Sequence, residues 1–360
     1  MTSLSFVHES RAQRVRFGAG SLAALADEVA ALGARRAIVL CTPEQRATAE
    51  LVAGLLGDRA AGIFAGAVMH VPVEVAREAR AYAASVNADC AVAVGGGSTT
   101  GLGKAIALES ALPILAVPTT YAGSEMTPIW GITEGGVKKT GRDVRVLPRG
   151  VLYDPELTLS LPLGLTVTSA INAIAHAVEG LYAHDGNPVI GLQAEEGIRA
   201  AAAAVLQLPS RPGDIDARSE ALYAAWLCGA VLGSVSMGLH HKLCHTLGGT
   251  FDLPHADVHT VILPHALAFN AAHAPQAVAR IARALDAAGV AAGPNVAVRF
   301  FALIKAAGAP TSLADIGMPA DGLERAADLA SQNQYPNPRP LERPALRALL
   351  ERAYAGASPQ

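Results

Sequence analysis

The sequence lacks the cysteine pairs and basic clusters that mark several protein classes. Its four cysteines are far apart and form no CxxC pair, so we expect reduced, buried thiols and neither a disulfide framework nor a zinc knot. No cluster of Lys and Arg is interleaved with aromatic residues, and the formal net charge is −3. Such a surface offers little attraction to a phosphate backbone, so nucleic acid is not expected as a partner.

Apolar runs long enough to cross a membrane are also missing. The run from Ala221 to Val235 contains Gly, Trp and Ser and is shorter than the roughly 20 residues that a bilayer requires. The first residues, MTSLSFVHESRAQRVRF, are polar and charged and lack the apolar core of a secretory signal. We therefore expect no membrane partner and a cytoplasmic location.

The scarcity of charge favours a large packed interior. Only 16% of the residues are charged, whereas 51% are apolar, and Ala and Gly are abundant. The 360 residues exceed the roughly 250–300 at which a single hydrophobic core stops growing. Two domains are therefore predicted.

The first half of the chain alternates between short apolar or β-branched runs and Ala-rich helical stretches. This alternation predicts a parallel sheet with helices on both faces. The expected strands are 37–41, 62–65, 90–94 and 114–117, and the expected helices are 21–32, 43–56, 73–86 and 101–108.

The second half has helical periodicity and no strand of comparable quality. Pro155 can begin a new element but cannot continue a strand or helix from before it. We therefore expect an α/β domain with a parallel sheet at residues 1–153 and an all-α domain at residues 154–360.

A glycine run follows the expected strand 90–94 and opens a helix. Gly95, Gly96, Gly97 and Ser98 let backbone N–H groups approach a pyrophosphate closely, and the helix N-terminus adds partial positive charge. This run is not the GxGxxG fingerprint, so a tight turn without a ligand remains an alternative for the run alone.

A second loop strengthens the prediction of a dinucleotide site. Thr119, Thr120 and Ser124 follow the expected strand 114–117. Two adjacent parallel strands place such loops at the same carboxyl edge, where open α/β sheets bind ligands. After the strand that ends near Cys41, Thr42 stands where an acidic residue often holds the adenosine ribose. Neither NADH nor NADPH is therefore favoured.

Histidines are concentrated in one stretch, since six of the eleven lie between positions 240 and 265. His241 and His245 are four apart on an expected helix that Gly248 and Gly249 would end, so both project from one face. His255 follows after a turn. Upstream, another expected helix carries Asn172 and His176, also four apart.

Three interpretations of these residues remain open. A metal site would use His176, His241 and His255, with Asn172 where an anionic oxygen is expected. A metal-free site would use a histidine as a proton donor. Ordinary core or surface imidazoles are the third interpretation, and the one that we expect for the other seven histidines. Those are His8, His70, His184, His240, His259, His265 and His273.

Four motifs resemble the iron-containing alcohol dehydrogenase superfamily, and within it the maleylacetate reductase branch. They are Gly95–Lys104 (GGGSTTGLGK), Pro118–Glu125 (PTTYAGSE), the helix Ile171–Tyr182, and His240–Ala256 (HHKLCHTLGGTFDLPHA). The motifs occur in order and cover nearly the whole chain. The resemblance implies a dehydroquinate synthase-like fold, with a nucleotide-binding α/β domain, a helical catalytic domain and an active-site cleft between them.

The resemblance also implies a metal site, but with a departure. Metal-dependent members hold their ion at the positions of Asn172, His176, His241 and His255, and the first of these is an Asp in those members. Without that carboxylate a bound divalent metal is doubtful. Gly101 is a second departure, because metal-dependent relatives carry Asp there. A metal-dependent alcohol dehydrogenase or aldehyde reductase remains the alternative.

The resemblance implies reduction of the C=C bond of maleylacetate, a dicarboxylate, to 3-oxoadipate with NADH or NADPH in the degradation of aromatic compounds. His245 is the candidate proton donor, with His241 or His255 polarising the enolate oxygen or holding a carboxylate. Dianions need cationic partners, and Lys242 and Arg142 are candidates unless they are ordinary surface charges.

Two further residues and the assembly complete these expectations. Lys139 is assigned to the cofactor. Tyr121 would donate a hydrogen bond near the nicotinamide or simply pack there. A homodimer is expected by default.

Overall fold

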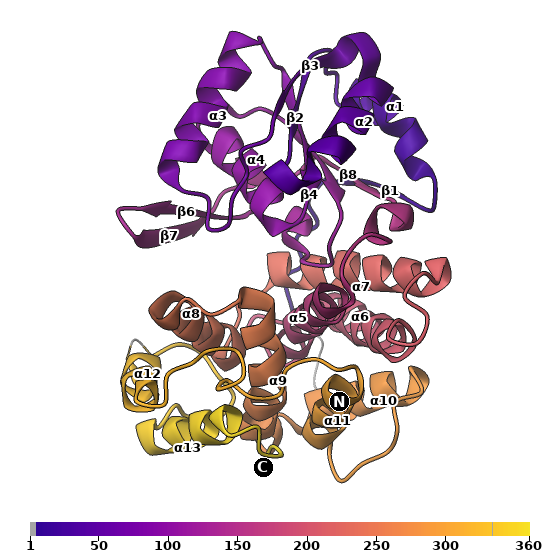
Figure 1. The fold of residues 1–360 in the computed structure, drawn as a ribbon. Helices are drawn as coiled ribbons and strands as arrows, with labels where there is room; N and C mark the ends of the chain where they lie inside the picture. Colours follow the sequence, from indigo (N-terminus) through magenta and orange to yellow (C-terminus); the bar gives the residue numbers. More distant parts are fainter. Residues whose placement is uncertain (1–4, 333) are drawn as a thin grey trace. The chain divides into compact units, whose positions relative to one another are not determined.

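A computed structural model describes residues 5–332 and 334–360, which form two compact units (Figure 1). The α/β unit comprises Ser10–Leu161, and the helical unit comprises Pro162–Gln360 together with residues 5–9. Asp154, which the expected division places at the start of the second domain, contacts the α/β unit. Its carboxylate accepts hydrogen bonds from the N–H groups of Gly20 at 3.1 Å and Leu22 at 2.9 Å.

The α/β unit contains a six-stranded parallel sheet with the strand order β1-β8-β5-β4-β2-β3. The strands are β1 (Arg14–Phe17), β2 (Ala37–Leu40), β3 (Ala60–Phe64), β4 (Cys90–Gly95), β5 (Ile114–Pro118) and β8 (Gly150–Tyr153). Every residue of the inner strands β2, β4 and β5 is buried, as expected for strands covered on both faces. The predicted parallel sheet is confirmed.

Helices cover both faces of this sheet, also as predicted. They are α1 (Leu25–Ala31), α2 (Arg46–Leu56), α3 (Val73–Ser85) and α4 (Gly97–Ser110). Successive side chains of a strand point to opposite faces. Val39 of β2 accordingly joins the core with α1 and α2, whereas Ile38 and Leu40 join the core with α3 and α4. Figure 1 shows α1 and α2 on one side of the sheet and α3 on the other.

The sequence did not predict β1, β8 or the antiparallel hairpin of β6 (Ile129–Glu134) and β7 (Val137–Arg142). In β1, Arg14 and Arg16 replace apolar residues at alternate positions. Both ion-pair with the buried Glu28 of α1, at 2.7 and 2.6 Å. These ion pairs bring charged residues into a strand that has no apolar signature.

The helical unit confirms the prediction of an all-α second half, since the described residues after Tyr153 contain no strand. Its helices are α5 (Leu163–Leu181), α6 (Pro188–Gln207), α7 (Ile215–Ser234), α8 (Leu239–Phe251), α9 (His255–Ala271), α10 (Pro275–Ala287), α11 (Val296–Ala306), α12 (Gly322–Ser331) and α13 (Arg343–Tyr354). One large hydrophobic core joins α8, α9, α12 and α13.

Helix α8 is longer than predicted. Gly248 and Gly249 lie inside it, and the chain leaves the helix at Asp252, whose φ of 52° is left-handed. Each glycine costs a helix interior about 1 kcal/mol relative to alanine. Burial of Leu243 and Leu247 in the core outweighs that cost.

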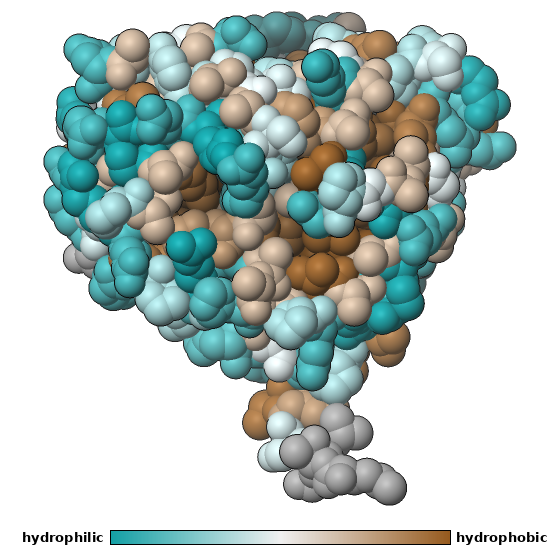
Figure 2. Space-filling model, turned by 90° about the horizontal axis from the view of Figure 1, so that it is seen from below, coloured by the Kyte–Doolittle hydropathy of each residue, from teal (hydrophilic) through white to brown (hydrophobic). Residues whose placement is uncertain are grey.

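The surface and the helix lengths complete the description. Figure 2 shows one face, on which hydrophobic residues reach the surface between hydrophilic ones, as is usual for folded chains. In the described part of the chain, no single helix has the length and apolar character to span a membrane. Among the described helices, α7 and α8 pass that test as a pair, and they are bent by 96°.

Candidate active site

The glycine run lies between β4 and the first turn of α4. Gly95 has a φ of 149°, and a Cβ there would meet Gln45 Oε1 and Thr99 Oγ1 at 2.5 Å. A Cβ on Gly96 would lie 3.0 Å from Thr120. No side chain of the described residues caps α4, so its first N–H groups can receive a phosphate. The helix begins at Gly97 and not at the expected position 101.

The structure brings the second loop next to this run. Gly95 pairs with Pro118 in the register of β4 and β5, and the Thr119 N–H donates to the Gly95 carbonyl at 3.2 Å. Gln45 Nε2 donates to Thr119 Oγ1 at 2.7 Å. Gly96, Gly97 and Ser98 thus share one sheet edge with Thr119 and Thr120, which is the arrangement that the predicted cofactor site requires.

A buried lysine, which the sequence analysis did not single out, holds the end of the second loop. Lys104 Nζ donates to the Ser124 carbonyl at 2.6 Å, to the Ser124 and Thr127 hydroxyls at 3.2 and 2.9 Å, and to the Ile129 carbonyl at 2.8 Å. Burial lowers the pKa of Lys104 to about 7. Ser124, a predicted cofactor residue, is therefore fixed by this side chain.

The remaining predicted residues of the α/β unit lie outside these two loops or beneath the surface. The Tyr121 side chain is completely buried. Lys139 and Arg142 lie on the exposed strand β7. Lys139 Nζ is 2.7 Å from Glu134 in an exposed ion pair, which water screens and which can be given up for an anionic ligand.

Six histidines form one cluster in the helical unit. Helix α5 contributes His176, α8 contributes His240, His241 and His245, and α9 contributes His255 and His259. The ring centroids of His176 and His241, and those of His241 and His259, are 5.0 Å apart. His255 lies 4.3 Å from His259 and 6.3 Å from His245. The predicted set is thus brought together.

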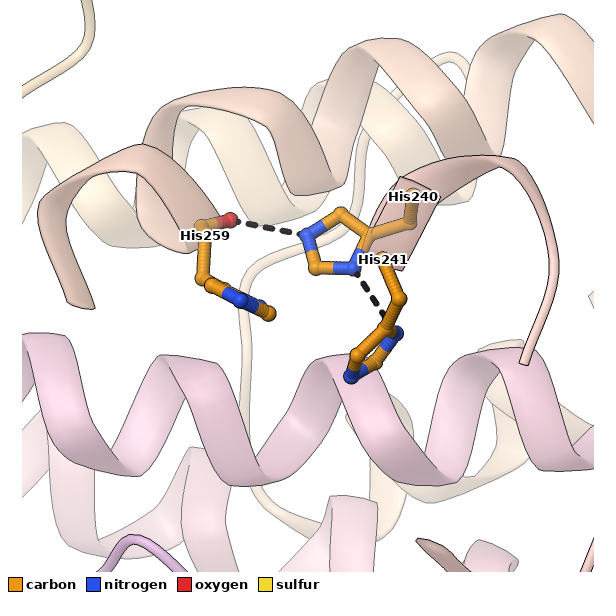
Figure 3. Close-up of side chains that lie close together, drawn as sticks. All are labelled: His240, His241 and His259. Atoms are coloured by element: carbon orange, nitrogen blue, oxygen red, sulfur yellow. Dashed lines mark hydrogen bonds between the residues drawn. The ribbon is translucent and has the colours of Figure 1, made fainter. Parts of the chain in front are cut away.

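The cluster also contains two histidines for which we expected an ordinary core or surface position. His240 and His259 are buried against His241, with ring centroids 5.0 Å apart in each pair (Figure 3). His240 Nε2 lies 3.1 Å from the His259 carbonyl. The spacing of four between His255 and His259 places both on one face of α9, which is the signal that could have revealed His259.

Glu179 is the carboxylate that the sequence analysis missed. It lies on the same face of α5 as Asn172 and His176, seven and three residues further along. Its side chain has 0% exposure, and Oε2 is 2.7 Å from His241 Nδ1. Burial raises the pKa of Glu179, whereas the nearby His240 and the N–H groups at the start of α8 lower it.

The cluster provides neutral nitrogen donors. Burial and the neighbouring rings lower the pKa values of His176, His241 and His259 well below the ordinary value. In the described part of the chain, His176 Nδ1, His241 Nε2, both ring nitrogens of His259 and Asn172 Oδ1 are buried without a hydrogen-bond partner.

This donor set is a poor fit for a tightly held divalent ion. Asn172 offers an amide oxygen, and the Glu179 carboxylate faces His241 Nδ1 and the start of α8. Two positive charges in a buried site would therefore lack a directly bound anion.

Two family models match the chain. "Iron-containing alcohol dehydrogenase" matches residues 12–155, and "Fe-containing alcohol dehydrogenase family, C-terminal" matches residues 166–354. The chain belongs to the iron-containing alcohol dehydrogenase family. The resemblance seen in the sequence, and the fold class that it implied, are confirmed.

Relatives within this family are similar over the full length. A maleylacetate reductase of Burkholderia cepacia is 66% identical over 99% of both chains. The crystal structure of a putative alcohol dehydrogenase from Ralstonia eutropha JMP134 has a TM-score of 0.97 and 62% identity, covering 99% of this chain and 100% of that one. The crystal structure of maleylacetate reductase from Agrobacterium tumefaciens has a TM-score of 0.95 and 50% identity, with the same coverage.

Proposed function

We propose that this protein reduces the C=C bond of maleylacetate to 3-oxoadipate with NADH or NADPH, in the degradation of aromatic compounds. The observation that carries the proposal is the imidazole cluster, in which Asn172 replaces the carboxylate of metal-dependent relatives. The full-length similarity to maleylacetate reductases supports the choice of substrate.

The reaction requires one hydride and one proton. A reduced nicotinamide held by the glycine run and the second loop would supply hydride from C4 to the alkene carbon β to the ketone, and the π electrons would move onto the ketone oxygen as an enolate. A proton then adds to the α carbon, which leaves 3-oxoadipate and the oxidised nicotinamide. A histidine that titrates near neutrality is suited to donate that proton.

The exposed histidines of the cluster are suited to contact the substrate. His245 and His255 are exposed in the helical unit, with nearly parallel rings inclined by 19°. We assign proton donation to His245 and stabilisation of the enolate oxygen or a carboxylate to His241 or His255. Lys242, exposed on α8 with its ammonium 5.6 Å from the centre of the Tyr335 ring, and Arg142 are proposed partners of the carboxylates.

The cofactor phosphates are assigned to the glycine run and the second loop. Gly96, Gly97 and Ser98 offer N–H groups at the start of α4, and Thr119, Thr120 and Ser124 offer hydroxyls. Lys139 is proposed as a further contact. Because Thr42 follows β2, the proposal covers both NADH and NADPH.

A cytoplasmic homodimer belongs to the same proposal. Light scattering of the purified protein tests whether it is a dimer.

An oxidation assay tests the proposed function. Purified protein is given NADH or NADPH with maleylacetate or with simple aldehydes, before and after exhaustive chelation. We expect cofactor oxidation with maleylacetate that survives chelation. Activity on aldehydes that requires iron or zinc would establish the alternative, a metal-dependent alcohol dehydrogenase or aldehyde reductase. Consumption of no NADH or NADPH would exclude both.

A further inference from the structure

The contacts of Glu179 indicate that this side chain does more than fill space in α5. Both carboxylate oxygens face the start of α8, where Oε2 accepts from the Gly238 N–H at 3.0 Å and Oε1 accepts from the His240 N–H at 2.8 Å. Gly238, at the N-cap position, has no side chain to cap the helix, and Asn337 Oδ1 accepts from the Leu239 N–H at 3.3 Å. Burial raises the pKa of the Glu179 carboxyl, whereas several N–H donors and the positive end of the helix dipole favour its ionised form.

An ionised carboxylate fixes the proton of His241. Glu179 Oε2 can only accept a hydrogen bond, so His241 Nδ1, at 2.7 Å, carries the hydrogen. In a neutral imidazole the lone pair then lies on Nε2, and this nitrogen has no hydrogen-bond partner in the described part of the chain. His241 therefore presents an acceptor to its surroundings.

The neighbouring histidine agrees with this assignment. His240 Nε2 lies 3.1 Å from the His259 carbonyl oxygen, which can only accept, so His240 carries its hydrogen on Nε2 and its lone pair on Nδ1. That lone pair is 3.4 Å from His241 Nδ1, where a hydrogen is already assigned. Figure 3 shows both contacts of the His240 ring, and with these assignments no two hydrogens face each other.

We infer that Glu179 is a positioning residue that holds His241 as the Nδ1–H tautomer, so that Nε2 accepts a hydrogen bond during the reaction. The inference rests on the proposed function and assigns different roles to the histidines of the cluster. The enolate and carboxylates of the substrate have no hydrogen to offer to Nε2. A water molecule can donate one O–H to His241 Nε2, and its second O–H can stabilise the enolate oxygen. Direct donation to the substrate is thereby left to His245 and His255.

The tautomer is tested by nitrogen NMR of protein labelled with ¹⁵N-histidine. The His241 signals are assigned by their loss in His241→Asn. We expect a protonated Nδ1 and a lone-pair Nε2 in the unchanged protein, and loss of this preference in Glu179→Gln. A wild-type His241 protonated on Nε2 would overturn the inference. This measurement needs no turnover, so it stands even if maleylacetate is not the substrate.

Kinetics separate positioning from helix capping. Glu179→Gln should lower kcat by about 10–100-fold, the usual effect of losing a carboxylate that orients a functional imidazole, and leave the Kd of NADH unchanged. The matched control is Glu195→Gln, which removes a carboxylate from Arg280 and Arg283 on the same unit at 2.6 and 2.9 Å. Equal kcat values in both variants would overturn the positioning role.

A third variant guards against loss of folding. Glu179→Asp keeps the charge, and we expect it to restore the Nδ1–H tautomer and most of the lost kcat. If Glu179→Gln does not fold, this variant and the wild-type spectrum decide the question. Low kcat in Glu179→Asp with the tautomer intact would refute the proposed role of the tautomer.

Discussion

The two units differ in whether their buried polar groups have hydrogen-bond partners within the protein. In the α/β unit, Lys104 donates to four oxygens of its own chain, and Thr99 Oγ1 is the buried side-chain atom of the described residues 10–161 that lacks a partner. In the helical unit, four ring nitrogens of the histidine cluster and Asn172 Oδ1 lack partners. Unpaired buried polar groups cost about 1–3 kcal/mol each. The Lys104 side chain thus finds its hydrogen-bond partners within the protein, whereas the histidine cluster requires water or a ligand.

The largest effect on turnover is expected in the histidine cluster of the helical unit, and it would sharpen this comparison. In His245→Ala the proposed proton donor is removed, and we expect kcat with maleylacetate to fall by about 100-fold or more, because a positioned acid contributes roughly 10²–10⁴-fold. The Kd of NADH, measured by fluorescence, should not change. The control is His184→Ala, which removes an exposed histidine of the same unit. Unchanged turnover in His245→Ala would refute the assignment.

Parts of this comparison could be predicted from the sequence, and others could not. The inner strands and the glycine run depend on local apolar runs and turn residues, which a sequence displays directly. The pairs His241 and His245, and Asn172 and His176, were found through spacings of four on expected helices, whereas His255 was found as the histidine that follows the next turn. Glu179 could not be assigned, because its function depends on the start of α8, which lies about sixty positions away in the chain. Strand β1 was missed since its arginines obtain their partner, Glu28, only in the folded chain.

The second prediction concerns the protonation of the buried Lys104 side chain and its effect on stability. The pKa of Lys104 is lowered to about 7 from 10.5, so between these values the unfolded chain binds more protons than the folded one. The free energy of unfolding therefore rises with pH in this window. Relative to Lys104→Met, we expect the unchanged protein to gain about 2 kcal/mol between pH 7 and pH 9, at about 1.4 kcal/mol per pKa unit. Urea unfolding at both pH values measures the difference.

Parallel stability curves for the two proteins would contradict this expectation. They would mean that the four oxygen acceptors compensate the ammonium for burial, and that Lys104 stays charged throughout the range. The contrast between the two units would then be sharper, because the lysine would be fully satisfied in its charged form.

The third prediction tests the close packing of the two cofactor loops. In Gly96→Ala the new Cβ would lie 3.0 Å from the Thr120 side chain, so that side chain or its loop must shift by a few tenths of an ångström. We expect the Kd of NADH to rise about 10-fold, which corresponds to about 1.4 kcal/mol. Gly54→Ala on α2 is the control, since its Cβ meets nothing within 4 Å. An unchanged Kd would show that these loops do not hold the cofactor tightly.

The smallest expected effect lies at the edge of the histidine cluster. Lys242 is exposed, so water and salt screen its attraction for a carboxylate. If it contacts the dicarboxylate, Lys242→Ala should raise the KM for maleylacetate about 3–5-fold, less so at high salt, with kcat nearly unchanged. The control is Lys305→Ala, which removes an exposed lysine from α11. Equal KM values in the two variants would make Lys242 an ordinary surface charge. The dianion would then have to be held by Arg142 or by the exposed imidazoles, whereas the buried lone pair on His241 Nε2 would still require a water molecule as its donor.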